Sequence, residues 1–417
     1  MSNNNSWFPS ADGPRQDVRD MESDGPAPDA GFLDTHRWIL AVAGVVVLAL
    51  IATLVIVLTR TPRGAAPAVT PSTTAAPATS STSSTAAASS TSSTAPSTTA
   101  ATTTSTTSTT PASSTVVANA YPLTGLPVKG TSGPALCIKI ENSIEARPQL
   151  GLDSADIVYE EVVEGGITRY MAVFQSNIPA KVEPVRSMRP MDPPMVLPLG
   201  CPLIFSGAQV PFLQAAAATG IQMIYMDRGD PGFSRDSAKA APHNVIGDTA
   251  KFLAQIQPVR VKPPAPPFTF ATSAAESTAG TQGKAAKSLN LTLSSVAHPN
   301  WTWDATSGQW LRSEGSTQAV AANGKRLSAT NVVALTVLVQ NTTFTDPANN
   351  PVPETKIVGS GKGVVASGGK TVAVSWSKAS EREQMVLTDA SGAPVKLAPG
   401  NTWVELVPTT GSITPQA

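Results

Sequence analysis

ALCIKIENSIEARPQLGLDSADIVYEEVVEGGITRYMAVF, residues 135–174, is the stretch that decides the fold of the chain's extended C-terminal region. It contains three short apolar runs, at 135–140, 157–163 and 170–174, separated by polar residues and glycines. Runs of this length and composition predict β-strands. Because neighbouring side chains of a strand point to opposite faces of a sheet, Glu160 and Glu161 are expected on opposite faces.

The pattern continues towards the C-terminus. PLIFSGA (202–208) predicts another strand, whereas FLQAAAATG (212–220) and DTAKFLAQI (248–256) predict short helices. Strands that alternate with helices favour an α/β domain, which we place at residues 121–260.

A proline cluster, PVRVKPPAPP (258–267), ends this domain. Because Pro-rich stretches are stiff spacers, we predict a Pro-rich linker and flexible insertion over 261–286. After it, apolar residues recur at every second position, as in NVVALTVLVQ (331–340), with Gly-containing turns between the runs. This period predicts a β-rich domain over 287–408, followed by a disordered tail over 409–417.

The sequence before residue 121 differs from these two predicted domains, which together we call the head. Trp38–Leu58 is a run of 21 residues without a charge, and a helix of that length spans about 30 Å, the thickness of a hydrocarbon core. A long polar segment precedes it and no small-residue cleavage site follows at once, which favours a retained anchor over a signal peptide. Residues 64–120 consist almost entirely of Ser, Thr, Ala and Pro, a composition typical of an extended, mucin-like stalk.

We therefore predict a single-pass membrane protein of the cell envelope, with its N-terminus in the cytoplasm and its head outside the membrane. The predicted segments are a disordered cytoplasmic tail (1–37), a transmembrane helix (38–58), a Ser/Thr/Ala/Pro-rich stalk (59–120) and the two-domain head. A stalk lifts a domain away from a surface, which is why the head is placed on the outer side.

Charge excludes one class of function. The chain has 29 basic and 29 acidic residues and only 14% charged residues, so it lacks the basic field that non-specific nucleic-acid binding needs. Two cysteines and three histidines, none at ligand spacing, argue against a metal site, and no cofactor is predicted. GSGKG (359–363) lacks the spacing of a phosphate-binding loop and predicts a glycine-rich hairpin instead.

The cysteines, Cys137 and Cys201, fall in the same predicted domain. In an oxidising exterior, two cysteines in one small domain favour a disulfide. Two buried free thiols are the alternative.

The most suggestive polar residues of the head are five candidates for ligand binding: Arg169, Arg186, Arg189, Arg235 and Asn244. Two arginine side chains at the spacing of EPVRSMRP (183–190) can hold a phosphate, sulfate or carboxylate through paired hydrogen bonds. The alternative is structural, because arginine–carboxylate networks also hold loops together.

His243 is the candidate catalytic residue, as an acid or a base, with Glu161 or Asp236 as its partner. Three functions stay open at this point. The head binds an anionic wall-layer polymer or acts as an envelope scaffold, it is a hydrolase or transferase acting on envelope substrates, or it docks a partner protein of the envelope.

The head resembles the YerB-like family of exported bacterial proteins. The resemblance rests on stretches that include YPLTGLPV (121–128), EPVRSMRP (183–190), APHNV (241–245) and SGAPVKLAPGNTWVELVP (391–408). It implies a two-domain head, α/β then β-rich, with no defined activity. Members of this family are often anchored by a lipidated cysteine after the signal segment. Since Cys137 and Cys201 are the only cysteines, the helix is expected to provide the anchor here.

Overall fold

The structure is a computed structural model that describes residues 119–417. The predicted tail, transmembrane helix and nearly all of the stalk lie outside the described residues. Among residues 119–417, no helix is long and apolar enough to cross a membrane.

A twelve-stranded sheet runs through the head in the order β10-β19-β18-β16-β22-β2-β3-β1-β5-β6, with β17 beside β16 and β20 beside β19. Its strands from the first half are β1 (Leu136–Glu141), β2 (Ile157–Val162), β3 (Thr168–Phe174), β5 (Leu203–Phe205) and β6 (Met223–Tyr225). Its strands from the second half are β10 (Lys284–Ala285), β16 (Asn331–Thr345), β17 (Pro351–Lys356), β18 (Gly359–Ser367), β19 (Lys370–Lys378), β20 (Val386–Thr388) and β22 (Thr402–Pro408). The three strands predicted within 135–174 are confirmed.

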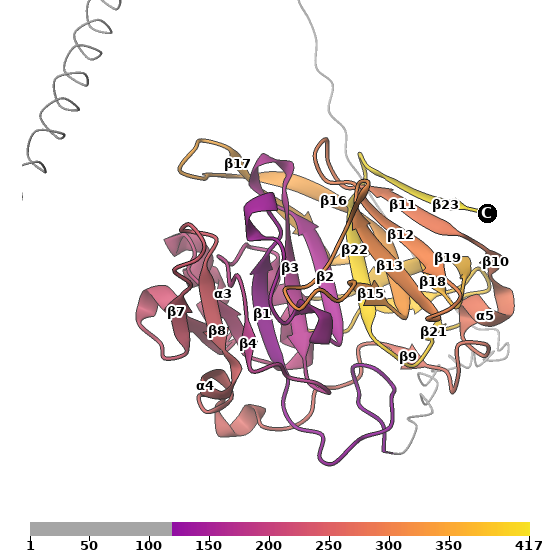
Figure 1. Cartoon of the computed structure of the whole chain (residues 1–417), viewed down its shortest axis with the longest axis horizontal. Helices are drawn as coiled ribbons and strands as arrows, with labels where there is room; N and C mark the ends of the chain where they lie inside the picture. Colours follow the sequence, from indigo (N-terminus) through magenta and orange to yellow (C-terminus); the bar gives the residue numbers. More distant parts are fainter. Residues whose placement is uncertain (1–118) are drawn as a thin grey trace, which may run out of the picture. The chain divides into compact units, whose positions relative to one another are not determined.

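The two halves join where β2 pairs with β22 in parallel, with Ile157 opposite Thr402 and Glu160 opposite Glu405. The α/β region and the β-rich region therefore share one sheet, which Figure 1 shows as adjoining magenta and yellow strands. Because adjacent strands exchange backbone hydrogen bonds, each half satisfies polar groups of the other.

A second sheet of six strands has the order β14-β13-β12-β11-β23, with β15 beside β13. Its strands are β11 (Ser288–Thr292), β12 (Pro299–Asp304), β13 (Gln309–Glu314), β14 (Thr317–Gln318), β15 (Ser328–Ala329) and β23 (Ser412–Gln416). The prediction of a disordered tail over 409–417 is wrong: β23 pairs with β11 from Ser412 to Gln416 (Figure 1). The tail is ordered because it satisfies the free edge of β11 and packs Ile413 against the core.

Short helices and two small sheets complete the head. The helices are α2 (Asp192–Val196), α3 (Val210–Ala218), α4 (Thr249–Leu253) and α5 (Thr278–Gln282), and the small sheets are β4 (Lys181–Val182) with β8 (Val245–Asp248) and β7 (Phe233–Arg235), and β9 (Thr269–Phe270) with β21 (Lys396–Leu397). Both predicted helices are confirmed as α3 and α4.

The prediction of a flexible insertion up to residue 286 is wrong. Ser277 caps α5 by accepting a hydrogen bond from the backbone N–H of Gly280, and β10 pairs with β19. Tertiary pairing therefore orders a segment whose small polar residues give little local signal.

Arg312 of β13 connects the two sheets. Its side chain is fully buried, with Nη2 2.6 Å from Glu160, Nη1 2.8 Å from Glu405 and Nη2 2.9 Å from Glu314. The rings of Tyr170, Trp301 and Trp403 surround its guanidinium group, with centroids 4.7 to 5.5 Å away.

The three carboxylates and the aromatic rings compensate a charge that would otherwise be costly to bury. Although burial alone would lower it, the pKa of Arg312 is held well above its ordinary value, chiefly by Glu160. Burial and the neighbouring Glu160 raise the pKa of Glu405. The guanidinium group is thus the cation that allows two buried carboxylates to face each other across β2 and β22.

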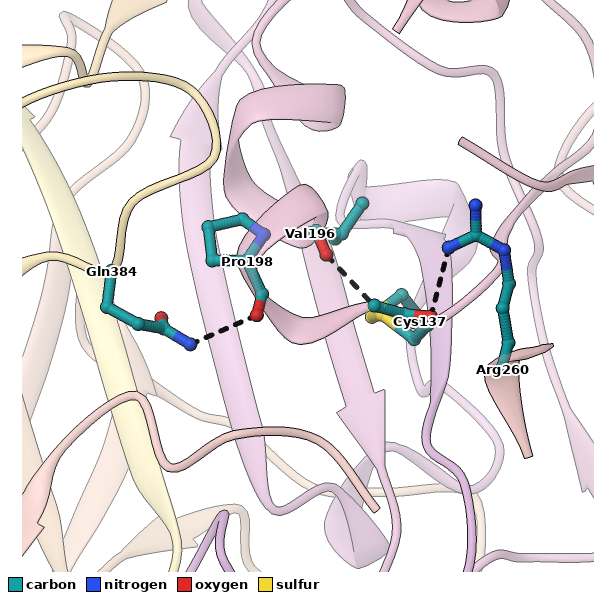
Figure 2. The surroundings of a disulfide bond; sticks show 7 residues. Cys137, Val196, Pro198, Arg260 and Gln384 are labelled. Carbon is teal, nitrogen blue, oxygen red and sulfur yellow. Dashed lines mark hydrogen bonds between the residues drawn. A yellow bond between two sulfur atoms is a disulfide. The ribbon is translucent and has the colours of Figure 1, made fainter. Parts of the chain in front are cut away.

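The predicted disulfide is confirmed between Cys137 of β1 and Cys201, which precedes β5. Figure 2 shows its surroundings: Cys201 Sγ lies 4.0 Å from the carbonyl oxygen of Val196, and Gln384 Nε2 donates to the carbonyl of Pro198 at 3.1 Å. The bridge closes a sequence separation of 64 residues, which in the chain-entropy model stabilises the folded head by about 4 kcal/mol.

We predict that Arg312→Ala destabilises the head by about 3–5 kcal/mol, because it leaves buried carboxylates without their cation. Chemical denaturation followed by tryptophan fluorescence would measure the free energy of unfolding. The deficit should shrink as the pH falls towards 5, since protonation removes the uncompensated charges. The matched control is Lys325→Ala, which removes an exposed lysine 3.7 Å from Asp153 and should cost less than about 1 kcal/mol. Equal effects of the two substitutions would contradict the role given to Arg312.

Candidate functional site

The face of the sheet opposite Arg312 carries a row of charged side chains. Arg169 of β3 lies between Glu141 of β1 and Glu161 of β2 as their cross-strand partner, so the three side chains project from the same face. Lys139, two positions before Glu141, shares that face. All four residues are buried. Glu160 belongs to the Arg312 cluster, so the prediction that Glu160 and Glu161 face opposite ways is confirmed.

The segment 183–190 lies along β1 and brings two further arginines to the row. Two backbone hydrogen bonds join this segment to β1: the Glu141 N–H donates to the Pro184 carbonyl, and the Arg186 N–H donates to the Lys139 carbonyl. Arg186 Nε then lies 3.0 Å from Glu141 Oε1. Arg169 Nη1 donates to the carbonyl of Ser187 at 2.9 Å.

Arg189 is held by a carboxylate of its own. Its Nε and Nη2 donate to the two oxygens of Glu164 at 2.5 and 2.8 Å, a bidentate pair, and its backbone N–H donates to Asp192. Although burial opposes it, the Arg189 guanidinium holds the pKa of Glu164 below its ordinary value. Arg189 therefore cannot form one clamp together with Arg186 unless it leaves Glu164.

We call Arg169, Arg186 and Arg189 the arginine cluster. Arg169 is its least compensated member: among the described residues it forms no ion pair, unlike Arg186 and Arg189, and its Nε, like that of Arg186, has no hydrogen-bond partner. Burial, and then the charges of Arg189 and Arg186, lower the pKa of Arg169 to about 9. The cluster thus holds a buried cation that is poorly stabilised by its neighbours.

His243 lies at the edge of the same site, but its partner is not the predicted one. Nδ1 of His243 is 3.1 Å from Glu141 Oε2 and 3.3 Å from Ser143 Oγ. Glu161 instead pairs with Lys139, and the Asp236 side chain accepts from the backbone N–H of Ala238 in its own loop. The prediction of Glu161 or Asp236 as partner is therefore corrected to Glu141, which is buried and placed by the end of β1.

Arg235 and Asn244 bond to each other. Arg235 Nη1 donates to Asn244 Oδ1 at 2.7 Å, and Asn244 Nδ2 donates to the carbonyls of Asp236 and Lys239. These contacts hold the loop that joins β7 to β8 and carries His243. Arg235 is exposed and Asn244 is buried, so the structure gives Asn244 the role of shaping this loop.

Sequence reasoning missed Glu141, Ser143, Lys139 and Asp192. For Glu141 and Ser143 a signal was available in the sequence. Glu-Asn-Ser at 141–143 follows directly on an apolar strand, and polar side chains at the end of a strand often lie close to those of neighbouring strands. Lys139 and Asp192 had no comparable signal, because a lysine within a strand is usually exposed. Among residues 119–417, no group of three or more His, Cys, Asp or Glu side chains could hold a metal ion.

Comparison with known proteins agrees with this architecture. Residues 123–262 match the family model "Protein of unknown function (DUF3048) N-terminal domain", and residues 289–404 match the model of its C-terminal domain. The chain therefore belongs to this two-domain, YerB-like family.

Within the family, the chain is similar to "Putative lipoprotein YerB" of Bacillus subtilis (strain 168). The two are 28% identical over 302 residues, which cover 69% of this chain and 86% of the relative. The crystal structure of YerB from Bacillus subtilis has the same fold, with a TM-score of 0.60 and 22% identity, over 71% of this chain and 99% of that one.

Beside the arginine cluster, Lys139 is shared by two carboxylates. It pairs with Glu161 and lies 2.7 Å from Asp192, all three groups being fully buried. Burial and the neighbouring Asp192 raise the pKa of Glu161 to about 8. Since the folded protein then holds a proton that the unfolded chain releases near its ordinary pKa, the contribution of Glu161 to stability is present below about pH 4.5 and is lost as the pH rises through about 8.

We predict that the melting temperature of the chain falls between pH 5 and pH 8.5, and that Glu161→Gln reduces this fall because the amide cannot ionise. Thermal unfolding across this range would measure it. The control is Glu354→Gln, which removes a partly exposed carboxylate paired with Lys356 and should leave the profile unchanged. Parallel profiles for wild type and Glu161→Gln would show that Glu161 does not titrate in this range.

Proposed function

We propose that this chain is a membrane-anchored, extracytoplasmic protein of the cell envelope whose head binds an anionic ligand at the arginine cluster. The anchor is the uncharged run Trp38–Leu58. Two observations support the location: the length of that run matches a hydrocarbon core, and the similar Bacillus protein carries the name "Putative lipoprotein YerB". In this proposal the head stands outside the membrane on the Ser/Thr/Ala/Pro-rich segment.

The observation that carries the ligand proposal is the buried, poorly compensated charge of Arg169. Three arginines share two carboxylates, Glu141 and Glu164, within the cluster. A third acid, Asp346 in a turn, interacts electrostatically with Arg189. Its carboxylate already accepts hydrogen bonds from the Ala348 N–H and from Asn350 Nδ2. An anion next to Arg169 and Arg186 would bond to the free Nε and balance the charge.

The cluster is reachable from solvent on one side. The side chains of Arg186 and His243 are 20% and 22% exposed, whereas Arg169 is buried. A phosphate or carboxylate group of a wall-layer polymer fits such a site, because guanidinium groups bind these planar or tetrahedral anions through paired hydrogen bonds. Arg235, exposed on the neighbouring loop, is available to a longer polymer.

We predict that Arg186→Gln weakens the binding of a purified phosphate-containing wall polymer by about tenfold or more, as expected for loss of a charge-assisted hydrogen bond. Calorimetry of the full chain in detergent would measure the affinity. The control is Arg382→Gln, an exposed arginine whose Nη2 donates to the carbonyl of Thr219 away from the cluster. Equal affinities of wild type and Arg186→Gln would refute the assignment of the site.

A hydrolase or transferase is the second candidate, and the Glu141–His243 pair favours it. Nδ1 lies 3.1 Å from the Glu141 carboxylate and 3.3 Å from Ser143 Oγ, and Nε2 has no hydrogen-bond partner among residues 119–417. An imidazole held in this way by a carboxylate is the arrangement of a general base or acid.

The two candidates differ in what His243→Gln does. For a binding protein, we predict that the variant keeps the polymer affinity within about threefold and that the wild type releases no product from the polymer. For an enzyme, the wild type releases soluble fragments, detected by mass spectrometry, and both His243→Gln and Glu141→Gln abolish the release by factors of about 100 or more. Asp236→Asn serves as the control and should leave release unchanged.

A further inference from the structure

The head contains an apolar cavity of about 590 Å³ that is separate from the arginine cluster. Its wall comes from three segments: the first described residues (119–132), the proline cluster with the strand after it (263–270), and the region of β20 and the turn after it (384–395). The prolines predicted to act as a spacer are therefore part of a cavity wall. Its volume lies in the range of small-molecule sites.

The cavity is held open by rigid packing. The ring of Phe270 lies so close to Gly125 that a Cβ there would come within 2.5 Å of the ring, and Gly125 has a φ of +66°, which favours glycine. β9, which contains Phe270, pairs with β21. Pro263, Pro266 and Pro267 have fixed φ angles. A wall of this kind does not need to order itself when a ligand enters, which favours affinity.

The lining selects an uncharged, apolar occupant. None of the residues that line the cavity is charged, and aromatic rings contribute through Tyr121, Phe268 and Phe270. The hydroxyl of Tyr121 already donates to the Lys129 carbonyl, and Gln384 Nε2 donates to Pro198.

Hydrogen-bonding capacity distinguishes a hydrocarbon from a peptide. Ser132 Oγ accepts from Gln175, so three of the five polar side chains in the wall, Tyr121, Ser132 and Gln384, already hold a hydrogen bond within the protein. A peptide would bury backbone N–H and C=O groups without enough partners, at a cost of about 1–3 kcal/mol for each. A hydrocarbon chain has no such groups and loses nothing.

Exposed lysines adjoin each of the three lining segments in the sequence. Lys129 follows Val128, Lys262 precedes Pro263 and Lys396 follows Val395, and all three are exposed. Glu383, next to Gln384, is the one acid adjacent in sequence to a lining residue. The surroundings of the cavity therefore suit an anionic headgroup on an apolar chain.

The position of the cavity along the chain points to a source of such molecules. Asn119, in its wall, follows the last residue of the apolar run Trp38–Leu58 by 61 positions. Even a fully extended chain of that length reaches at most about 220 Å. If the run is the membrane anchor, as in the proposed function, the cavity is permanently tethered to lipid, which raises the effective concentration of its ligand.

We infer that this cavity binds the acyl chain of an anionic membrane lipid. A phospholipid and a free fatty acid share this chemistry, an apolar chain with a negative head. The inference rests on the proposed anchor for its source of lipid and not for the shape or lining of the cavity.

The test uses the full chain in liposomes of phosphatidylglycerol and phosphatidylethanolamine that contain a trace of phosphatidylglycerol with a diazirine in its acyl chain. After illumination and proteolysis, mass spectrometry locates the lipid adducts. A parallel sample contains a diazirine fatty acid instead, and competition between the two probes identifies the preferred source. Val386→Trp fills the cavity from β20, at a lining residue that is 50% exposed. Pro266→Trp fills it from the proline segment, and Leu338→Trp, on an exposed position of β16 outside the lining, is the control.

We expect adducts on peptides 263–270 and 384–387 of the wild type and of Leu338→Trp, and at least a fivefold loss in Val386→Trp and Pro266→Trp. Unchanged melting temperatures would show that the variants are folded. Unlabelled cavity peptides in the wild type, or full labelling in both filled variants, would overturn the inference. Adducts on residues 38–58 report the anchor separately, so a failure of the anchor and a failure of the cavity give different patterns.

Discussion

The buried guanidinium group of Arg312 is the interaction on which the rest of the head depends. Glu160 and Glu405 face each other across the parallel pair of β2 and β22. In the twelve-stranded sheet of residues 119–417, this pairing joins the strands of the first half to those of the second. Two carboxylates in that position repel each other unless a cation lies between them. Arg312 supplies that cation from the second sheet. One side chain therefore fixes the register of the two halves and the packing of the two sheets.

This constraint explains why the two halves of the family's sequence form a single platform. The central sheet is covered on both faces, so both of the adjacent residues Glu160 and Glu161 are buried. Each lies against a cation: Arg312 on one face and Lys139 on the other. The arginine cluster lies on the Lys139 face, and its position is rigid because β1, β2 and β3 cannot shift without breaking the ionic contacts on both faces.

The charge-poor composition of the chain makes its few buried ions informative. A head with few charged residues has placed several of them where burial is costly. In some cases, such as the Glu164–Arg189 pair, the two charges balance each other through a bidentate contact, which is a structural role. Arg169, with an unbonded Nε and a lowered pKa, is not matched. Arg169 and Arg189 both donate to the carbonyl of Ser187, but only Arg189 has a carboxylate bound to its guanidinium group. This difference separates a structural role from a candidate binding role.

The sequence alone determined the strands of residues 135–174, the two short helices, the β-rich second half and the choice of Cys137 and Cys201 as a disulfide, because local period and composition control these features. It also pointed to Arg169 and Arg186 as candidate binding residues and to His243 as a candidate acid or base. Only the tertiary structure decided that Glu141 is the partner of His243, that residues 412–416 form a strand, that 261–286 is ordered, and that the proline cluster lines a cavity. These depend on contacts between residues far apart in the chain, and a short segment without its own period takes its structure from the edge or face against which it packs.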